Sequence, residues 1–189
     1  HQDGMLDFSR CRSFNLDEYV GLTPGHPCSY RRFMDDELFS HINIKETNVP
    51  LGSAPDLQAE TQRYDAMIEQ AGGIDIQLLG LGQNGHIGFN EPDRSFSYGT
   101  QVVTLTKNTI KANRRFFGSE NDVPRQAISL GIGGIMKARQ IVLIAYGISK
   151  AQAVRDMIKG PVDPMCPSSI LQLHPDTVIL LDAQAASLL

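Results

Sequence analysis

Short apolar segments that alternate with segments of helical periodicity place the strongest constraint on the fold of this chain. Two of them, Ile74–Leu79 and Gln140–Gly147, have the length and the β-branched, apolar composition of buried strands. Short strands that alternate with helices predict βα units. The sequence therefore predicts an α/β fold of the Rossmann-like type, with a mainly parallel sheet flanked by helices.

The remaining elements follow from the same periodicity. Further strands are predicted at Cys11–Leu16, Thr100–Thr106, Ala127–Leu130 and Val178–Leu181. Helices are predicted at Cys28–Phe39, Pro55–Ala71, Lys111–Phe117 and Lys150–Lys159, and a turn at Gly131–Gly134. No internal repeat is present, and 189 residues fit a single domain that spans residues 1–189.

Composition excludes several classes of protein. The net charge of −4 does not provide the basic surface of a nucleic-acid-binding domain. No apolar run approaches the ~20 residues that a membrane-spanning helix needs. The three cysteines are odd in number and far apart, which argues against a disulfide framework and a zinc ribbon. We therefore expect reduced thiols in a cytoplasmic protein that binds neither nucleic acid nor membranes.

Polar residues near the strand ends are the candidates for function, because ligands of α/β folds bind beyond the carboxyl ends of the strands. Asp17 and Glu18 follow the first predicted strand directly. Adjacent side chains on extended backbone point apart, so only one of the two can face a given pocket. On their own such residues most often serve as turn or cap residues, and a catalytic role is the alternative that this segment leaves open.

The second predicted strand is followed by a formal GxGxxG pattern at Gly80–Gly85. A dinucleotide-binding fingerprint would open a long helix here and carry an acidic residue about 20 positions later. Pro92 interrupts any such helix, and Thr100–Thr106 contains neither Asp nor Glu. We interpret the glycines instead as backbone that a ligand can approach closely.

The same loop continues with His86 and Glu91, which could form a base held in one tautomer by a carboxylate. The alternative is a loop histidine that is hydrogen-bonded to backbone. Asn84 and Asn90 crowd the same end of the strand, which favours a functional site. No third ligand has a suitable spacing, so the sequence predicts no metal site.

Two cationic residues indicate an anionic ligand. Ser149 is predicted to cap the helix that follows the strand Gln140–Gly147, and Lys150 adds a positive charge to that helix start. Arg115 lies beside aromatic residues and has a guanidinium group suited to phosphate. A solvated lysine and a surface salt bridge are the alternatives. Together, Lys150 and Arg115 predict a phosphorylated small molecule.

Several motifs of the chain resemble those of the glucosamine-6-phosphate deaminase family, in the same order from about Phe14 to Leu181. These motifs are Phe14–Leu22, His26–Tyr30, Gly80–Pro92, Asn113–Phe117, Gly147–Ala151 and Leu171–Pro175. The resemblance implies conversion of glucosamine 6-phosphate and water into fructose 6-phosphate and ammonia, in amino-sugar catabolism and without a cofactor.

The resemblance also implies roles for individual residues. Asp17 is similar to the base that moves a proton between C2 and C1 of the sugar. His86 is similar to the residue that opens the pyranose ring, with Glu91 as its orienting partner. Arg115 and Lys150 are similar to the phosphate ligands.

Asn84 occupies a position where many members of the family have Asp. Its amide oxygen could still accept a hydrogen bond from His86. An amide supplies no negative charge, so we expect His86 to be less basic than it would be beside Asp. Glu91 would then carry more of the electrostatic role.

Three positions bear on regulation. The hexameric bacterial members of the family bind an allosteric amino-sugar phosphate through Ser, Arg and Lys, where this chain has Arg94, Gln101 and Val103. None of the three matches. We therefore expect no such activation, and a monomer rather than an allosteric hexamer.

The chain also lacks the first strand, the first helix and the Thr/Gly/Ser phosphate loop that precede Phe14 in the family. We expect a protein incomplete at the N-terminus to bind substrate weakly and to be poorly soluble.

Two alternative functions share this architecture. A 6-phosphogluconolactonase would continue with an HTASLFP-like sequence where this chain has His86–Pro92. A non-catalytic sugar-phosphate-sensing domain would normally be attached to a helix-turn-helix, and would not need Asp17, His86 and Glu91 together.

Overall fold

The computed structural model describes Gly4 and residues 6–189, which form two compact units. Unit 1 contains the chain up to Tyr64 together with Val102–Ser129. Unit 2 contains Asp65–Gln101 and Leu130–Leu189. The sheets are mostly parallel and are accompanied by helices, which confirms the predicted α/β fold class. One family domain over residues 1–189, incomplete at its N-terminus, stays a prediction.

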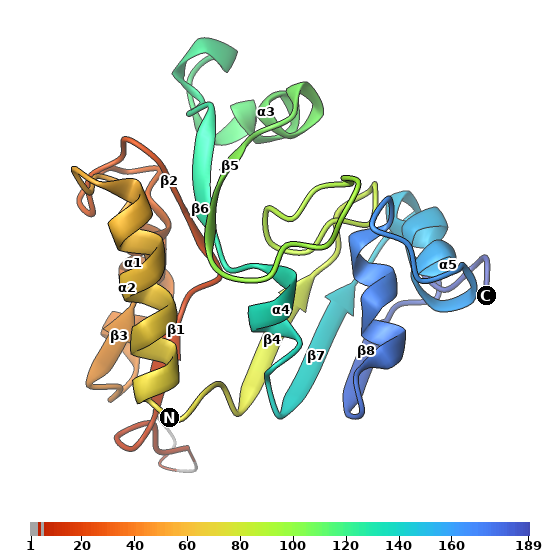
Figure 1. Cartoon of the computed structure of the whole chain (residues 1–189), viewed down its shortest axis with the longest axis horizontal. Helices are drawn as coiled ribbons and strands as arrows, with labels where there is room; N and C mark the ends of the chain where they lie inside the picture. The colour runs from red at the N-terminus through yellow and green to blue at the C-terminus, as the bar shows by residue number, and fades with distance from the viewer. Residues whose placement is uncertain (1–3, 5) are drawn as a thin grey trace. The chain divides into compact units, whose positions relative to one another are not determined.

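Unit 2 contains a parallel sheet of three strands in the order β4-β7-β8, and the arrows of β4 and β7 point the same way in Figure 1. The strands are β4 (Ile76–Gly80), β7 (Gln140–Ala145) and β8 (Thr177–Leu181). The accompanying helices are α4 (Ile132–Ile135), η4 (Ile148–Lys150), α5 (Ala151–Lys159) and η5 (Pro167–Leu173), where η denotes a 3-10 helix. All three strands were predicted from their apolar, β-branched composition.

The two faces of this sheet differ in burial. The buried face carries Leu79, Ile141, Leu143 and Ala145, whereas Ile76, Leu78, Ile144 and Leu180 are exposed. The prediction that Ile74–Leu79 and Gln140–Gly147 are buried strands is wrong for one face of each, because Ile76 is 63% exposed and Ile144 is 42% exposed. Successive side chains of a strand point to opposite faces, and the described residues cover mainly one of these faces.

Unit 1 contains two small sheets. In the first, β1 (Arg12–Phe14) pairs in parallel with β3 (Glu46–Asn48). The second has the order β2-β6-β5, and β2 (Asp17–Tyr19) runs antiparallel to β6 (Gln126–Ser129). Strand β5 (Gln101–Thr104) completes this sheet, with its first residue counted in unit 2.

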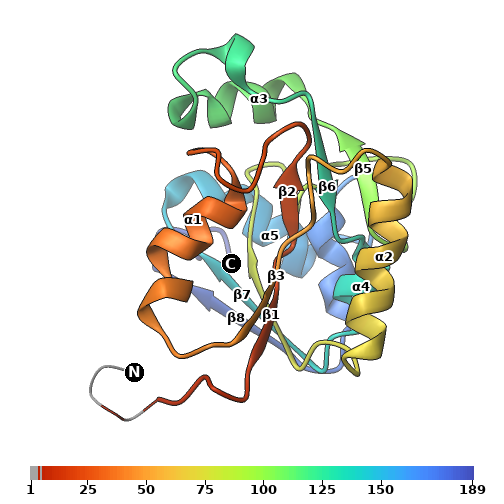
Figure 2. The ribbon, with the colours of Figure 1, turned by 90° about the vertical axis from the view of Figure 1, so that its left-hand side faces the viewer.

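The helices of unit 1 begin with α1 (Tyr30–Glu37) and with the first part of α2 (Leu57–Gln70), whose residues from Asp65 on are counted in unit 2. Figure 2 shows β1 and β3 running between α1 and α2. Shorter helices are η1 (Phe39–His41), α3 (Lys107–Asn113), η2 (Arg114–Phe116) and η3 (Glu120–Asp122).

Several predicted elements are corrected by the structure. Lys111–Phe117 is not one helix, because α3 ends at Asn113 and a 3-10 turn follows. Gly131–Gly134 is not only a turn, because α4 begins at Ile132. Ser149 does not cap α5, because the 3-10 helix η4 contains this serine and the capping position of α5 falls on Lys150.

Side-chain hydrogen bonds determine where helix α1 begins and how α2 is attached. The Ser29 Oγ accepts a hydrogen bond from the Arg32 backbone N–H at 3.4 Å, which satisfies one of the unpaired donors at the start of α1. On α2, the buried Tyr64 donates its hydroxyl hydrogen to the Asn15 carbonyl at 2.7 Å. That bond attaches α2 to the connection between β1 and β2.

Gly52 lies against β2 at a point where there is no room for a side chain. Its carbonyl accepts a hydrogen bond from the Gly21 backbone N–H at 2.8 Å. A Cβ atom at this position would overlap the Tyr19 carbonyl oxygen, which is backbone and therefore moves only if β2 moves.

We expect Gly52→Ala to lower the free energy of unfolding by about 1–3 kcal/mol, because overpacking against backbone shifts the strand. Urea unfolding followed by circular dichroism measures this change. Gly25→Ala is the matched control in the same unit, since its added Cβ has no neighbour within 4 Å. An equal loss of stability in both variants would contradict this account of Gly52.

Candidate active site

The loop after β4 folds back on itself through backbone hydrogen bonds. The Gly82 N–H donates to the His86 carbonyl at 2.8 Å, and the Gly85 N–H donates to the Gly82 carbonyl at 3.1 Å. Gly85 has a φ of +82°, a conformation that glycine adopts without strain. Residues 81–100 contain no helix, so the dinucleotide-binding pattern lacks the helix it requires.

Within this loop, Asn84 connects His86 and Glu91. The Asn84 Nδ2 donates to Glu91 Oε2 at 2.8 Å, and the Asn84 Oδ1 lies 2.6 Å from the His86 Nδ1. A carboxylate oxygen accepts hydrogen bonds, so the amide nitrogen must face Glu91 and the amide oxygen must face His86. His86 therefore carries its hydrogen on Nδ1, and its Nε2 is the nitrogen that can accept a proton.

This geometry confirms that the Asn84 amide oxygen can accept a hydrogen bond from His86. Glu91 lies 3.7 Å from the same ring nitrogen, so its direct interaction with His86 is longer than the bond through Asn84. Burial lowers the pKa of His86 below its ordinary value. The carboxylate of Glu91 partly opposes this change, and the positive charge of Lys150 adds to it. The imidazole is therefore neutral at neutral pH.

Lys150 reaches the loop from the next strand of the sheet. It lies at the end of η4, after β7, and its Nζ donates to the Leu81 carbonyl at 2.6 Å. Strands β4 and β7 are parallel, so the connections that follow them emerge at the same edge. Unit 2 thus brings together Asn84, His86, Glu91 and Lys150.

The ring of His86 lies directly against the backbone of Gly82. A Cβ atom at residue 82 would overlap the ring atoms Cγ, Nδ1 and Cε1. Glycine at this position is thus required by close approach of the histidine.

Asn90 holds the far end of the loop and was assigned no specific role from the sequence. It is 5% exposed, and its Nδ2 donates to the carbonyls of Ile87 at 3.0 Å and Leu130 at 2.9 Å. Its Oδ1 accepts from the Ser97 hydroxyl at 2.7 Å. Leu130 is far away in sequence, so no local pattern could have indicated this partner.

Asp17 lies in unit 1, within β2 rather than after a strand as predicted, and it pairs with Ser129 of β6. The side chain is half-buried. Desolvation, with a further contribution from the neighbouring Glu18 carboxylate, raises the pKa of Asp17 to about 7. Such a value is suited to a general base that works near neutral pH.

Arg115 also belongs to unit 1 and is exposed in η2. Its guanidinium carbon lies 4.6 Å from the centre of the Phe116 ring. The next residue, Phe117, is buried with its ring edge-on to Tyr19 at 5.3 Å, so η2 is anchored on β2, the strand that carries Asp17. The predicted site residues are thus divided between the units, with Asp17 and Arg115 in one and the remaining four in the other.

The part of the chain that the structure describes offers no cluster of metal ligands. Outside residues 1–3 and 5, no group of three or more His, Cys, Asp and Glu side chains is arranged to hold a metal ion. Among the same residues, no helix has both the length and the apolar character needed to cross a bilayer. The three cysteines are unpaired.

A neutral histidine, a bridging amide, a carboxylate and a lysine lie together at one edge of a parallel sheet, an arrangement with which an α/β enzyme can move protons. The profile of the glucosamine-6-phosphate isomerases and 6-phosphogluconolactonases matches residues 1–180. The chain belongs to this family.

Individual relatives are similar over the whole chain. A glucosamine-6-phosphate deaminase of Thermoanaerobacter pseudethanolicus is 54% identical over 100% of this chain and 76% of its own length. One of Clostridium perfringens is 52% identical over 100% of this chain and 79% of its own length. A solved structure described as a monomeric glucosamine-6-phosphate deaminase is 46% identical, with a TM-score of 0.97, over 100% of this chain and 79% of that chain.

A more distant structure shares the fold alone. The 6-phosphogluconolactonase of Thermotoga maritima is 16% identical, with a TM-score of 0.74, over 95% of this chain and 76% of that chain.

We expect Gly82→Ala to displace the His86 ring from Asn84 and from its buried position. Because burial is what lowers the pKa of His86, that pKa should rise toward its ordinary value. An NMR titration of the histidine ring measures the change. Gly80→Ala, two residues earlier and with no neighbour within 4 Å of the added Cβ, should leave the titration unchanged. An unchanged His86 pKa in Gly82→Ala would contradict the close approach.

Proposed function

We propose that this protein is a glucosamine-6-phosphate deaminase, which converts glucosamine 6-phosphate and water into fructose 6-phosphate and ammonia in amino-sugar catabolism. The observation that carries the proposal is the network in which Asn84 connects His86 to Glu91. Identities of 54% and 52% to relatives named glucosamine-6-phosphate deaminase support the same substrate. The net reaction breaks a C–N bond with water after an isomerisation step.

Ring opening comes first, since the substrate is a closed pyranose. The anomeric hydroxyl must lose a proton and the ring oxygen must gain one. In the proposed mechanism, the His86 Nε2 accepts the first proton and delivers it to the ring oxygen, while Nδ1 stays hydrogen-bonded to Asn84. Glu91 orients Asn84 through the amide N–H and favours the protonated form of His86 during the transfer.

Isomerisation follows on the open-chain amino aldehyde. We assign Asp17 as the base that removes the weakly acidic hydrogen at C2, which produces an enolate whose O1 takes a proton from water to give the enol. The same carboxyl group returns the proton to C1, leaving an imine at C2. Water adds to that imine, and ammonia leaves to give the ketone of fructose 6-phosphate. A pKa of about 7 makes Asp17 a much stronger base than an ordinary carboxylate.

The phosphate end of the sugar is proposed to bind Lys150 and Arg115. Lys150 lies beside the loop that carries His86, and Arg115 lies on the segment anchored to β2. Phosphate bound at a distance from C1 and C2 supplies binding energy that fixes the reacting carbons.

Substitution of the proposed base tests this function. We expect Asp17→Asn to lower kcat for ammonia release by a factor of about 10²–10⁴, since an amide cannot accept the C2 proton. Substrate binding should remain, because Asp17 is not assigned to the phosphate. Calorimetric titration measures binding, and an ammonia assay measures turnover. Asp75→Asn, at a carboxylate that is 80% exposed, is the control.

Two results would argue against the proposal. The first is full ammonia release by Asp17→Asn. The second is hydrolysis of 6-phosphogluconolactone by the unmodified protein without ammonia release from glucosamine 6-phosphate, which would favour the lactonase branch of the family.

We further propose that the enzyme acts as a cytoplasmic monomer that has no allosteric amino-sugar site. Its phosphorylated substrate is charged at neutral pH and does not cross membranes, which favours action inside the cell. The similar solved structure is described as monomeric. Arg94, Gln101 and Val103 do not match the allosteric ligands of the family's hexamers.

Sedimentation and kinetics test the proposed monomer. We expect sedimentation at the mass of one chain, and a rate curve that N-acetylglucosamine 6-phosphate leaves hyperbolic. A change from a sigmoidal to a hyperbolic curve on adding that sugar would refute this part of the proposal.

A further inference from the structure

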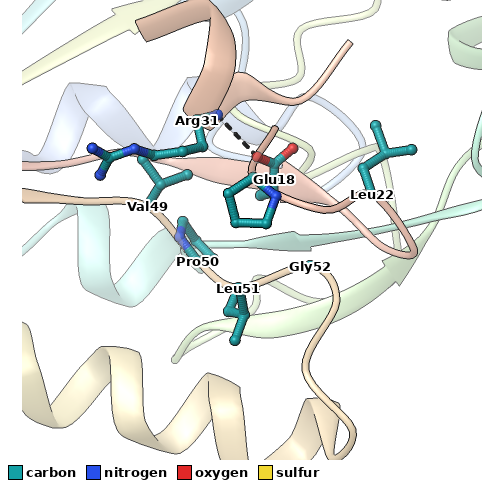
Figure 3. A pocket seen from close by; sticks show the side chains of 8 residues that line it. Glu18, Leu22, Arg31, Val49, Pro50, Leu51 and Gly52 are labelled. Carbon is teal, nitrogen blue, oxygen red and sulfur yellow. Dashed lines mark hydrogen bonds between the residues drawn. The ribbon is translucent and has the colours of Figure 1, made fainter. Parts of the chain in front are cut away.

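The carboxylate of Glu18 is buried in unit 1 and is not used by the proposed reaction. Its side chain accepts hydrogen bonds from four donors, and Glu18 is only 2% exposed. The donors are the Tyr19 N–H at 2.8 Å, the Ser29 hydroxyl at 2.7 Å, the Tyr30 N–H at 3.0 Å and the Arg31 N–H at 3.0 Å. Figure 3 shows the last of these bonds.

These donors fix the position of the Glu18 carboxylate. Three come from the start of α1, where backbone N–H groups have no partner within the helix and the helix dipole favours a negative charge. Hydrogen bonds to an ionised acceptor are stronger than those to a neutral one. Arg31 is a nearby cation, but its guanidinium is paired with Asp35 at 2.9 Å. The hydrogen bonds to the Glu18 carboxylate come from the four donors named above.

Glu18 also has little contact with bulk solvent, since it is only 2% exposed. The carboxylate forms part of the wall of a cavity of about 260 Å³, shown in Figure 3. Most of the remaining wall is apolar, from Leu22, Pro24, Val49, Pro50 and Leu51. In surroundings with few water molecules, a fixed charge acts more strongly on its neighbours than it does at the surface.

We propose that Glu18 is a positioning residue of the isomerisation step, whose fixed negative charge on the adjacent residue of β2 keeps Asp17 basic enough to take the C2 proton. This inference rests on the proposed role of Asp17. Alternation along the strand directs the two carboxylates to opposite faces, so Glu18 acts through its charge and through the position of β2, without touching the sugar.

The titratable groups of unit 1 that interact electrostatically with Asp17 lie on three elements. They are Glu18 and Tyr19 on β2, Tyr30 on α1 and Tyr64 on α2. Burial raises the pKa of Tyr19 to about 12 and raises the pKa values of Tyr30 and Tyr64, so all three phenols are neutral in the working range. Within this group, Glu18 supplies the charge that acts on Asp17.

The test compares the pH dependence of kcat/KM in the unsubstituted enzyme and in Glu18→Gln. The base must be ionised, so activity falls as the pH drops through the pKa of Asp17. Removal of the neighbouring negative charge lowers that pKa. We therefore expect the fall of kcat/KM at low pH, here called the acid limb of the pH profile, to move to lower pH in Glu18→Gln. We also expect kcat on the plateau to be reduced about 3- to 10-fold, because a weaker base transfers the proton more slowly. KM should remain within about twofold of the original value, since Glu18 is not a phosphate ligand.

Three variants serve as controls. Glu46→Gln removes a half-exposed carboxylate of unit 1 that pairs with Arg12, and it should not move the acid limb. Ser29→Ala removes one donor to Glu18 but leaves the charge, so it should lower stability without moving the limb. Asp17→Glu retains a base of different reach, so a shifted limb in this variant assigns the limb to residue 17 rather than to His86.

A direct measurement covers the case in which Glu18→Gln does not fold. Carboxyl carbon NMR follows Asp17 directly in the unsubstituted enzyme and in Glu18→Asp, which keeps the negative charge at residue 18, and we expect Asp17 to titrate in the same range in both. Loss of the raised Asp17 titration in a folded Glu18→Asp would overturn the inference. So would an acid limb that stays in place in a folded Glu18→Gln. Full turnover by Asp17→Asn would instead overturn the proposed role of Asp17, so the two failures are distinguishable.

Discussion

The parallel pairing of β4 with β7 is the constraint on which the site of unit 2 depends. Gly80 pairs with Ile144, so the two connections that follow these strands begin at the same edge of the sheet. The Lys150 ammonium therefore meets the Leu81 carbonyl and acts electrostatically on His86, although these residues lie far apart in sequence. A slip of one residue in this pairing would turn every side chain of β4 to the other face, which the unequal burial of the two faces opposes.

Two adjacent carboxylates in unit 1 have opposite environments. Glu18 receives four hydrogen bonds, whereas Asp17 is partly removed from water and its pKa rises to about 7. A carboxylate that loses water without gaining comparable partners is less stable in its charged form. Perturbed groups of this kind concentrate at functional sites, because the same desolvation that disfavours the charge strengthens the base.

The sequence predicted the long elements well and the short ones poorly. Ile74–Leu79 and the helix Pro55–Ala71 have enough periodic residues to be identified from neighbours in the chain, and the structure contains β4 and α2 there. Strands β2 and β3 have only three residues each, so no periodicity could reveal them. They exist because β6 and β1, distant in sequence, supply their hydrogen-bond partners.

By itself, the sequence determined the α/β class and the presence of Asn84, His86 and Glu91 in a single glycine-rich loop. These features depend on apolar periodicity and on residues within one turn of each other, which are local properties of the chain. Only the tertiary structure decided that Lys150 reaches this loop and that Glu18 is enclosed at the start of α1. Those outcomes depend on burial and on hydrogen-bond partners from other elements, because desolvation and charge act through space and not along the chain.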